Sequence, residues 1–164
     1  MNARGEIDLP DSVLERLDIA IASIHMPCFK DERTIDNVTA AYEKVMEHPY
    51  VDIIGHPDDG RFPVDMKRLV KKAKETGTLL EVNNSSLRPE GFRENTKENC
   101  LEMVKECKAQ GVMIVLGSDS HVDADIAEYP YAEEILRETD FPEELVANVS
   151  LEKLKACIKH GKKL

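Results

Sequence analysis

The sequence predicts an α/β fold built from consecutive parallel βα units. Short apolar runs rich in β-branched residues alternate with stretches whose apolar residues recur at helical spacing. The four runs begin near residues 18, 51, 78 and 112, which separates them by 33, 27 and 34 residues. Each interval suits a strand, a crossover helix and two loops, and such strands lie parallel with right-handed crossovers. An open doubly wound sheet and part of a barrel both agree with this pattern.

The first two units have clear boundaries. The first strand covers residues 18–25, and its helix presents one apolar face, made of Val38, Ala41, Tyr42, Val45 and Met46. The second strand covers residues 51–57, and its helix turns inward the side chains of Met66, Leu69, Val70 and Ala73. Asp65 is placed to cap this second helix, and Gly77 is placed to end it.

The third strand, residues 78–84, precedes a helix that Thr96 would cap and Gly111 would end. Its inward residues are Cys100, Met103, Val104 and Cys107. After the fourth strand, residues 112–121, we expect shorter pieces: a helix over 131–138, a short fifth strand at most around 147–149, and a terminal helix. Ser150 would open that last helix, with Leu151, Leu154 and Ile158 inward.

Composition narrows the class of protein. The 164 residues correspond to one domain, and the formal net charge of −10 with no basic stripe disfavours nucleic-acid binding. No apolar stretch approaches the roughly 20 residues of a membrane span, and the first residues lack a signal-peptide pattern. The four cysteines form no Cys-x-x-Cys pair, which favours reduced thiols. We therefore expect a cytoplasmic protein with no membrane or nucleic-acid partner.

Three of the four strands end in a candidate metal ligand: the first at His25, the second at His56, and the fourth at Asp119 and His121. Because the carboxyl ends of parallel strands share one face, we expect these side chains to meet there. Imidazole nitrogen with carboxylate oxygen suits zinc, manganese or iron. Taken singly, each residue would also fit a loop or capping role. Their common position at strand tips favours a hydrolytic metal centre.

Substrate-binding candidates lie beside these ligands. Asn83 and Asn84 follow the third strand, where amides orient ligands or simply form a turn. An acidic protein that binds a phosphate needs local cations, which Arg61, Arg88 or Arg93 in the loops would supply. Covalent catalysis has little support, because the segment 117–121 lacks the second glycine of a nucleophile elbow. His48 and His160 are expected to be surface residues.

Three sequence strings resemble the PHP family, named for polymerase and histidinol phosphatase, and above all its bacterial phosphatase branch. They are Asp-Ile-Ile-Gly-His-Pro (52–57), Leu-Glu-Val-Asn-Asn-Ser-Ser (80–86) and Leu-Gly-Ser-Asp-Ser-His (116–121). The resemblance implies a distorted (β/α)7 barrel with up to three metal ions, and hydrolysis of a small phosphomonoester by metal-activated water. By the same resemblance His25 and His56 would bind one ion, Asp119 a second and His121 a third.

The sequence also departs from that family. Its members carry a His-x-His motif, a Thr-Asp-His segment and a metal-bridging Glu upstream of the matching region, and this chain has no His-x-His or Thr-Asp-His. The first strand here corresponds to the family's fourth. The resemblance therefore implies that residues 1–164 are the carboxyl-terminal portion of a PHP domain, a partial barrel without its first strands. We expect a homo-oligomer that covers the free edge of the first strand.

Two alternatives stand beside the phosphoesterase. Catalytic zinc generally needs three protein ligands, and the four candidates would be divided among three ions. The chain would then be a catalytically inactive fragment acting only in metal binding or self-association. An amidohydrolase-like enzyme acting on C–N bonds would share the strand-tip ligands. The strings at 80–86 and 116–121 do not support that third interpretation.

Overall fold

The computed structural model describes residues 1–159 and contains one sheet of four parallel strands. The strands are β1 (Ile21–Ala22), β2 (Ile53–Ile54), β3 (Leu79–Asn83) and β4 (Ile114–Gly117), and they lie in the order β1-β2-β3-β4. Every neighbouring pair is parallel, with Ile53 of β2 opposite Ile21 of β1 on one side and Leu79 of β3 on the other. The predicted α/β fold with consecutive parallel βα units is confirmed.

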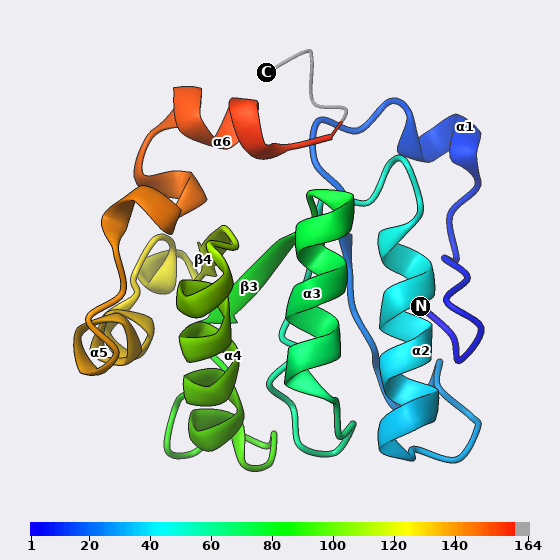
Figure 1. The fold of residues 1–164 in the computed structure, drawn as a ribbon, viewed down its shortest axis with the longest axis horizontal. Helices are drawn as coiled ribbons and strands as arrows, with labels where there is room; N and C mark the ends of the chain where they lie inside the picture. Colours follow the sequence, from blue (N-terminus) through cyan, green and yellow to red (C-terminus); the bar gives the residue numbers. More distant parts are fainter. Residues whose placement is uncertain (160–164) are drawn as a thin grey trace.

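Three long helices cover one face of this sheet. Figure 1 shows α2 (Ile35–Met46), α3 (Met66–Thr76) and α4 (Thr96–Gln110) side by side in front of the strands. A sequential strand order with right-handed crossovers places successive helices on the same face. A doubly wound sheet would have helices on both faces. The chain is therefore singly wound over these four units.

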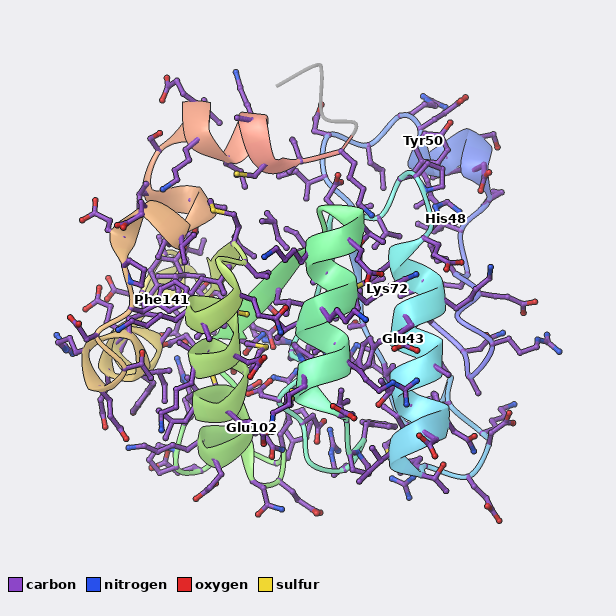
Figure 2. The ribbon with its side chains drawn as sticks, viewed as in Figure 1. Glu43, His48, Tyr50, Lys72, Glu102 and Phe141 are labelled. Carbon is purple, nitrogen blue, oxygen red and sulfur yellow. The ribbon has the colours of Figure 1, made fainter. Side chains whose placement is uncertain are left out.

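The predicted apolar helix faces form the main core. All thirteen residues expected to point inward from α2, α3 and α4 are buried, and they pack with Ile54, Leu80 and Ile114 of the sheet. Charged side chains bridge the outer surface between α2 and α3, where Glu43 and Lys72 are seen in Figure 2. Arg68 pairs with Glu43 at 2.8 Å. The spacing of apolar residues was thus a sufficient signal for this layer.

Local capping signals set most of the helix ends. Asp65 accepts a hydrogen bond from the Arg68 N–H at 3.1 Å, as predicted for the start of α3. Gly77 and Gly111 end α3 and α4 in the left-handed conformation, with φ of 66° and 68°. The prediction for the start of α4 was wrong by one residue. Asn95, with φ of 51°, is its N-cap, and Thr96 is already helical.

The segment after β4 differs from the expected fifth strand. Residues 147–149 form the 3₁₀ helix η3 (Ala147–Val149), and only Val146 makes an isolated parallel bridge with Ile114. The side chain of Asn148 replaces a neighbouring strand. It accepts from the Leu116 N–H at 3.0 Å and donates to the Leu116 carbonyl at 3.0 Å. The outer edge of β4 is therefore blocked by an amide side chain.

The rest of this region is helical. It comprises η1 (Asp123–Asp125), α5 (Pro130–Glu138), η2 (Glu143–Leu145) and α6 (Leu151–Cys157). Ser150 caps α6 as predicted. Leu151 does not point inward and is 55% exposed, whereas Ile158 is buried beyond the end of the helix. The short helix α1 (Asp11–Leu14) precedes β1. His160 lies outside the described residues.

The end of the described chain covers the inner face of the sheet, opposite the long helices. Ile53, Leu79 and Val115 pack there against Ala147 and Ile158. The buried carboxylate of Asp52 fixes this cover, because it accepts from the Ala20 N–H at 2.9 Å and from the Lys159 N–H at 2.7 Å. Among residues 1–159, no helix combines the length and apolar character needed to cross a membrane.

Candidate functional site

Side chains from all four strand ends meet at the carboxyl edge of the sheet. The imidazole rings after β1 and β2, His25 and His56, lie edge to face with centroids 4.9 Å apart. The guanidinium of Arg93, from the loop after β3, links the ends of β3 and β4 through hydrogen bonds. It donates to Asp119 Oδ2 at 3.1 Å and to Asn83 Oδ1 at 3.3 Å. The strand-tip positions therefore bring together His25, His56, Asn83 and Asp119.

His56 is held in an unusual backbone conformation. Its φ is 35°, in the left-handed region, and its N–H donates to Glu81 Oε2 at 2.7 Å. The ring is buried, and its Nδ1 has no hydrogen-bond partner. Burial first, then the positive charge of Arg93 and the neighbouring His25, lower the pKa of His56 to about 4. At neutral pH this imidazole is uncharged, which is the form that coordinates metal ions.

The other predicted metal ligands, His25, Asp119 and His121, are less buried than His56 or already have hydrogen-bond partners. His25 is exposed, and its Nε2 hydrogen-bonds Ser23 Oγ at 2.9 Å. Burial of Asp119 would raise its pKa, but the hydrogen bond and charge of Arg93 outweigh burial and lower it. His121 is exposed, with Nδ1 3.0 Å from the Asp119 carbonyl oxygen. Within residues 1–159, no three His, Cys, Asp or Glu side chains are grouped closely enough to hold an ion.

Glu81 is a central residue that the sequence reasoning missed. Its buried carboxylate accepts from the His56 N–H and, at 3.1 Å, from Asn83 Nδ2. One glycine makes room for it, because a Cβ at residue 117 would lie 1.9 Å from Glu81 Oε1. Burial raises the pKa of Glu81. The available signal was a single charge inside the apolar run 79–82, where no charge is needed for folding.

The arginines that are candidates for binding a phosphate differ in how deeply they are buried. Arg93 is the innermost, with a side chain only 6% exposed, and it also donates to Ser86 Oγ at 2.7 Å. Arg61 lies at the rim, where its guanidinium is paired with Asp59 and lies 4.9 Å from the centre of the Phe92 ring. The sequence pattern left Arg61, Arg88 and Arg93 equally placed to hold a phosphate. In the structure Arg93 is the arginine that touches the strand tips.

The two predicted amides also have separate positions. Asn83 faces the site, accepting from Arg93 and from the Ser86 N–H at 2.8 Å. Asn84 is buried and turns away from it. Its carbonyl oxygen accepts from the Tyr131 N–H at 2.9 Å and the Ala132 N–H at 3.1 Å, at the start of α5. Asn84 thus anchors α5 to the end of β3.

Asp58 carries a buried, unpaired carboxylate just behind the site. It is 1% exposed, and neither carboxylate oxygen has a hydrogen-bond partner. Burial raises its pKa to about 7. An unpaired buried carboxylate is costly, so its presence next to the strand tips marks a place where folding stability is not optimised.

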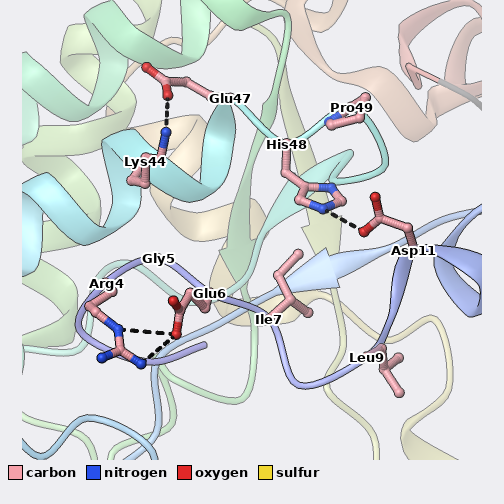
Figure 3. Close-up of a pocket in the computed structure, with 10 residues that line it drawn as sticks. All are labelled: Arg4, Gly5, Glu6, Ile7, Leu9, Asp11, Lys44, Glu47, His48 and Pro49. Carbon is pink, nitrogen blue, oxygen red and sulfur yellow. Dashed lines mark hydrogen bonds and ion pairs between the residues drawn. The ribbon is translucent and has the colours of Figure 1, made fainter.

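A separate cavity of about 470 Å³ lies between the amino-terminal segment and the end of α2 (Figure 3). Its charged side chains are already paired, two of the pairs within one segment each and one between the two segments. The pairs are Arg4–Glu6 at 2.8 Å, Lys44–Glu47 at 2.9 Å and His48–Asp11 at 3.2 Å. Because these charges already satisfy one another, the strand-tip cluster is the stronger candidate site.

The chain is similar in sequence to several bacterial proteins that are named probable phosphatases. A probable phosphatase of Clostridium novyi is 46% identical over 161 residues, covering 98% of this chain and 65% of the relative. One from Acetivibrio thermocellus is 42% identical, covering 96% of this chain and 64% of the relative. One from Thermoanaerobacter sp. is 38% identical, covering 99% and 66%. The chain therefore spans less than two thirds of each of these relatives. No protein-family model matches the chain.

The contact between Glu81 and Gly117 predicts a coupled pair of substitutions. Gly117→Ala should destabilise the fold by about 1 to 3 kcal/mol, because the new methyl group collides with the Glu81 carboxylate. In a Glu81→Ala background the same change should cost at least about 1 kcal/mol less. Urea unfolding of the four proteins measures this coupling. Gly77→Ala is the control for the coupling: its left-handed φ of 66° makes the change costly by itself, but nothing lies within 4 Å of that site, so the cost should be the same with and without Glu81. Additive effects at residues 81 and 117 would contradict the contact.

The unpaired Asp58 predicts that Asp58→Asn stabilises the fold, and does so more strongly as pH rises. In the unfolded chain this carboxyl ionises near its ordinary value of 3.8, but in the fold it keeps its proton to about pH 7. Its contribution to stability therefore falls as pH rises from 4 to 7, by a limit on the order of 4 kcal/mol. Asp58→Asn removes this penalty, so its advantage over the parent should grow across that range. A stability difference that stays flat from pH 4 to 8 would refute the burial of the charge.

Proposed function

We propose that the chain is the carboxyl-terminal portion of a metal-dependent phosphoesterase that hydrolyses a small phosphomonoester. The main support for this proposal is the buried Arg93 guanidinium at the strand tips, beside the imidazoles of His25 and His56. The His56 imidazole is uncharged, and its Nδ1 has no hydrogen-bond partner. The relatives named probable phosphatases support the phosphatase part of the proposal. The PHP assignment rests on the three sequence strings.

Arg93 would bind the phosphoryl group. In a chain with a net charge of −10, a phosphate needs a concentrated local cation. Arg93 offers this charge in a fixed position, because Asn83 and Ser86 hold its guanidinium. A planar guanidinium also matches the geometry of phosphate oxygens. Asn83 would act by positioning Arg93 and Glu81, while Arg61 at the rim would meet the outer part of the substrate.

The donor set fits part of a metal site. His56 provides a buried nitrogen with no other partner, and His25 lies against it. Asp119 provides a carboxylate on the adjacent tip, with His121 two residues further. Zinc, manganese or iron would suit these ligands, and bound ions would polarise phosphoryl oxygens and activate water. The remaining ligands would come from the part of the relatives that this chain does not span, or from a second copy.

The singly wound sheet supports a partial (β/α)7 barrel in which β1 is an edge strand, with the amino terminus of Met1 donating to the Ser23 carbonyl just beyond it at 2.8 Å. Ile21 of that strand is 59% exposed, and an uncovered edge strand favours pairing with another chain. We therefore propose a homo-oligomer formed across β1. The free thiols of all four cysteines are in keeping with action in the cytoplasm.

A catalytically inactive fragment is the second candidate function. It is favoured by one observation, the absence of any three-residue metal-binding group among residues 1–159. Such a chain would bind metal weakly or act only in self-association.

Metal content and phosphatase activity, measured on the same preparation, separate the two candidates. Elemental analysis after purification without chelator should give at least about one zinc, manganese or iron ion per chain. Hydrolysis of p-nitrophenyl phosphate should then fall at least about tenfold in Arg93→Met, because a charge-assisted contact is lost. Arg137→Met, on the exposed face of α5, serves as the matched control. Metal-free protein without activity would support the inactive fragment.

Self-association through β1 predicts a concentration-dependent mass. Sedimentation equilibrium should detect a species heavier than the 18.5 kDa chain, and Ile21→Lys should shift it toward monomer because a charge on an edge strand opposes pairing. Leu151→Lys is a suitable control, since Leu151 is similarly exposed but lies on α6. A clean monomer of the parent at high concentration would contradict this interface.

A further inference from the structure

A cavity of about 270 Å³ adjoins the strand tips in the loop between β3 and α4. Its lining includes the Ser85 and Ser86 hydroxyls, the Phe92 ring, and the side chains of Arg88 and Arg93. Arg93 belongs to both places, because it lines the cavity and also contacts Asp119 at the strand tips. A molecule held at the strand tips would therefore have this cavity beside it.

Both guanidinium groups that line the cavity have a buried donor left over. The Nη1 of Arg93 donates to Asn83 and Ser86, and its Nη2 donates one of its two hydrogens to Asp119, but its Nε has no hydrogen-bond partner. The Asp59 carboxylate is 3.9 Å from that Nε, too far for a hydrogen bond.

The guanidinium of Arg88 likewise has one paired terminal nitrogen and an unpartnered Nε. Its Nη2 donates to Asp125 at 2.7 Å, while its buried Nε is unpartnered. A small cavity lined by two arginine side chains and two serine hydroxyls, with one exposed carboxylate at Glu90, is suited to a group that carries negative charge.

We propose that this cavity binds a second anionic group, a carboxylate or a phosphate, on the alcohol portion of the substrate. The inference rests on the proposed function, since Arg93 would face the scissile phosphate on one side and this second group on the other. The cavity lies just below the usual range for drug-sized ligands, so it suits a small metabolite. Glu90 also lines it but is exposed, where solvent weakens its repulsion. The substrate class is thus a small phosphomonoester with two anionic ends.

Isothermal titration with matched ligands tests the subsite on the full chain. The probes are glycerol 3-phosphate, 3-phosphoglycerate, which adds a carboxylate, and 1,3-propanediol bisphosphate, which adds a phosphate. At least one two-anion probe should bind about tenfold or more tightly than glycerol 3-phosphate, and the preferred one identifies the second group. Arg88→Met should remove this preference, whereas Arg137→Met should preserve it.

A second substitution distinguishes binding from structural damage. Asp125→Asn frees Arg88 from its carboxylate partner, so it should tighten the two-anion probe several-fold, whereas a merely disordered loop would weaken it. Equal affinities for all three probes would overturn the subsite and leave the proposed function standing. If neither inorganic phosphate nor glycerol 3-phosphate binds, the proposed function is itself contradicted, and the subsite with it.

Discussion

The arrangement of the strand tips depends on one buried cation among several carboxylates. The Arg93 side chain is 6% exposed and lies 3.1 Å from Asp119 and 3.9 Å from Asp59, and its charge also acts on Asp58 and Glu81. Without this guanidinium, these carboxylates would repel one another in a region of low dielectric. Burial, and after it this same charge, lowers the pKa of His56 and keeps that imidazole neutral. Arg93 thus acts on the protonation of both kinds of candidate ligand.

The site also concentrates the features that cost stability. His56 and Asp119 have positive φ angles of 35° and 49°, which are unfavourable for residues with side chains. Asp58 adds an unpaired buried carboxylate. Positive φ angles also occur outside the site, at Asn95, Ala127 and Asp140, whereas the inward faces of the long helices are buried. The combination of a positive-φ histidine with an unpaired buried carboxylate beside the strand tips is the pattern expected where selection acts on function rather than on stability.

Most of the fold was predictable because its signals are local. Apolar spacing located α2, α3 and α4, and single residues such as Asp65 and Gly77 located helix ends. The failures have tertiary causes. Residues 147–149 looked like a strand, but Asn148 fills the strand's place with its side chain. The convergence of strand tips was expected, whereas the depth of Arg93, the role of Glu81 and the turn of Asn84 toward α5 depend on packing between distant segments.

The amide of Asn148 has a further consequence for assembly. Because it occupies the outer edge of β4, strand addition to the sheet of residues 1–159 would take place at the opposite edge, at β1. A sheet with only one edge available for strand pairing cannot extend head to tail into a filament. Two copies would have to meet through the same edge, related by a twofold axis, and the pair would then present blocked edges on both sides. In the proposed homo-oligomer, this single side-chain amide would therefore limit assembly to a closed pair and prevent filaments.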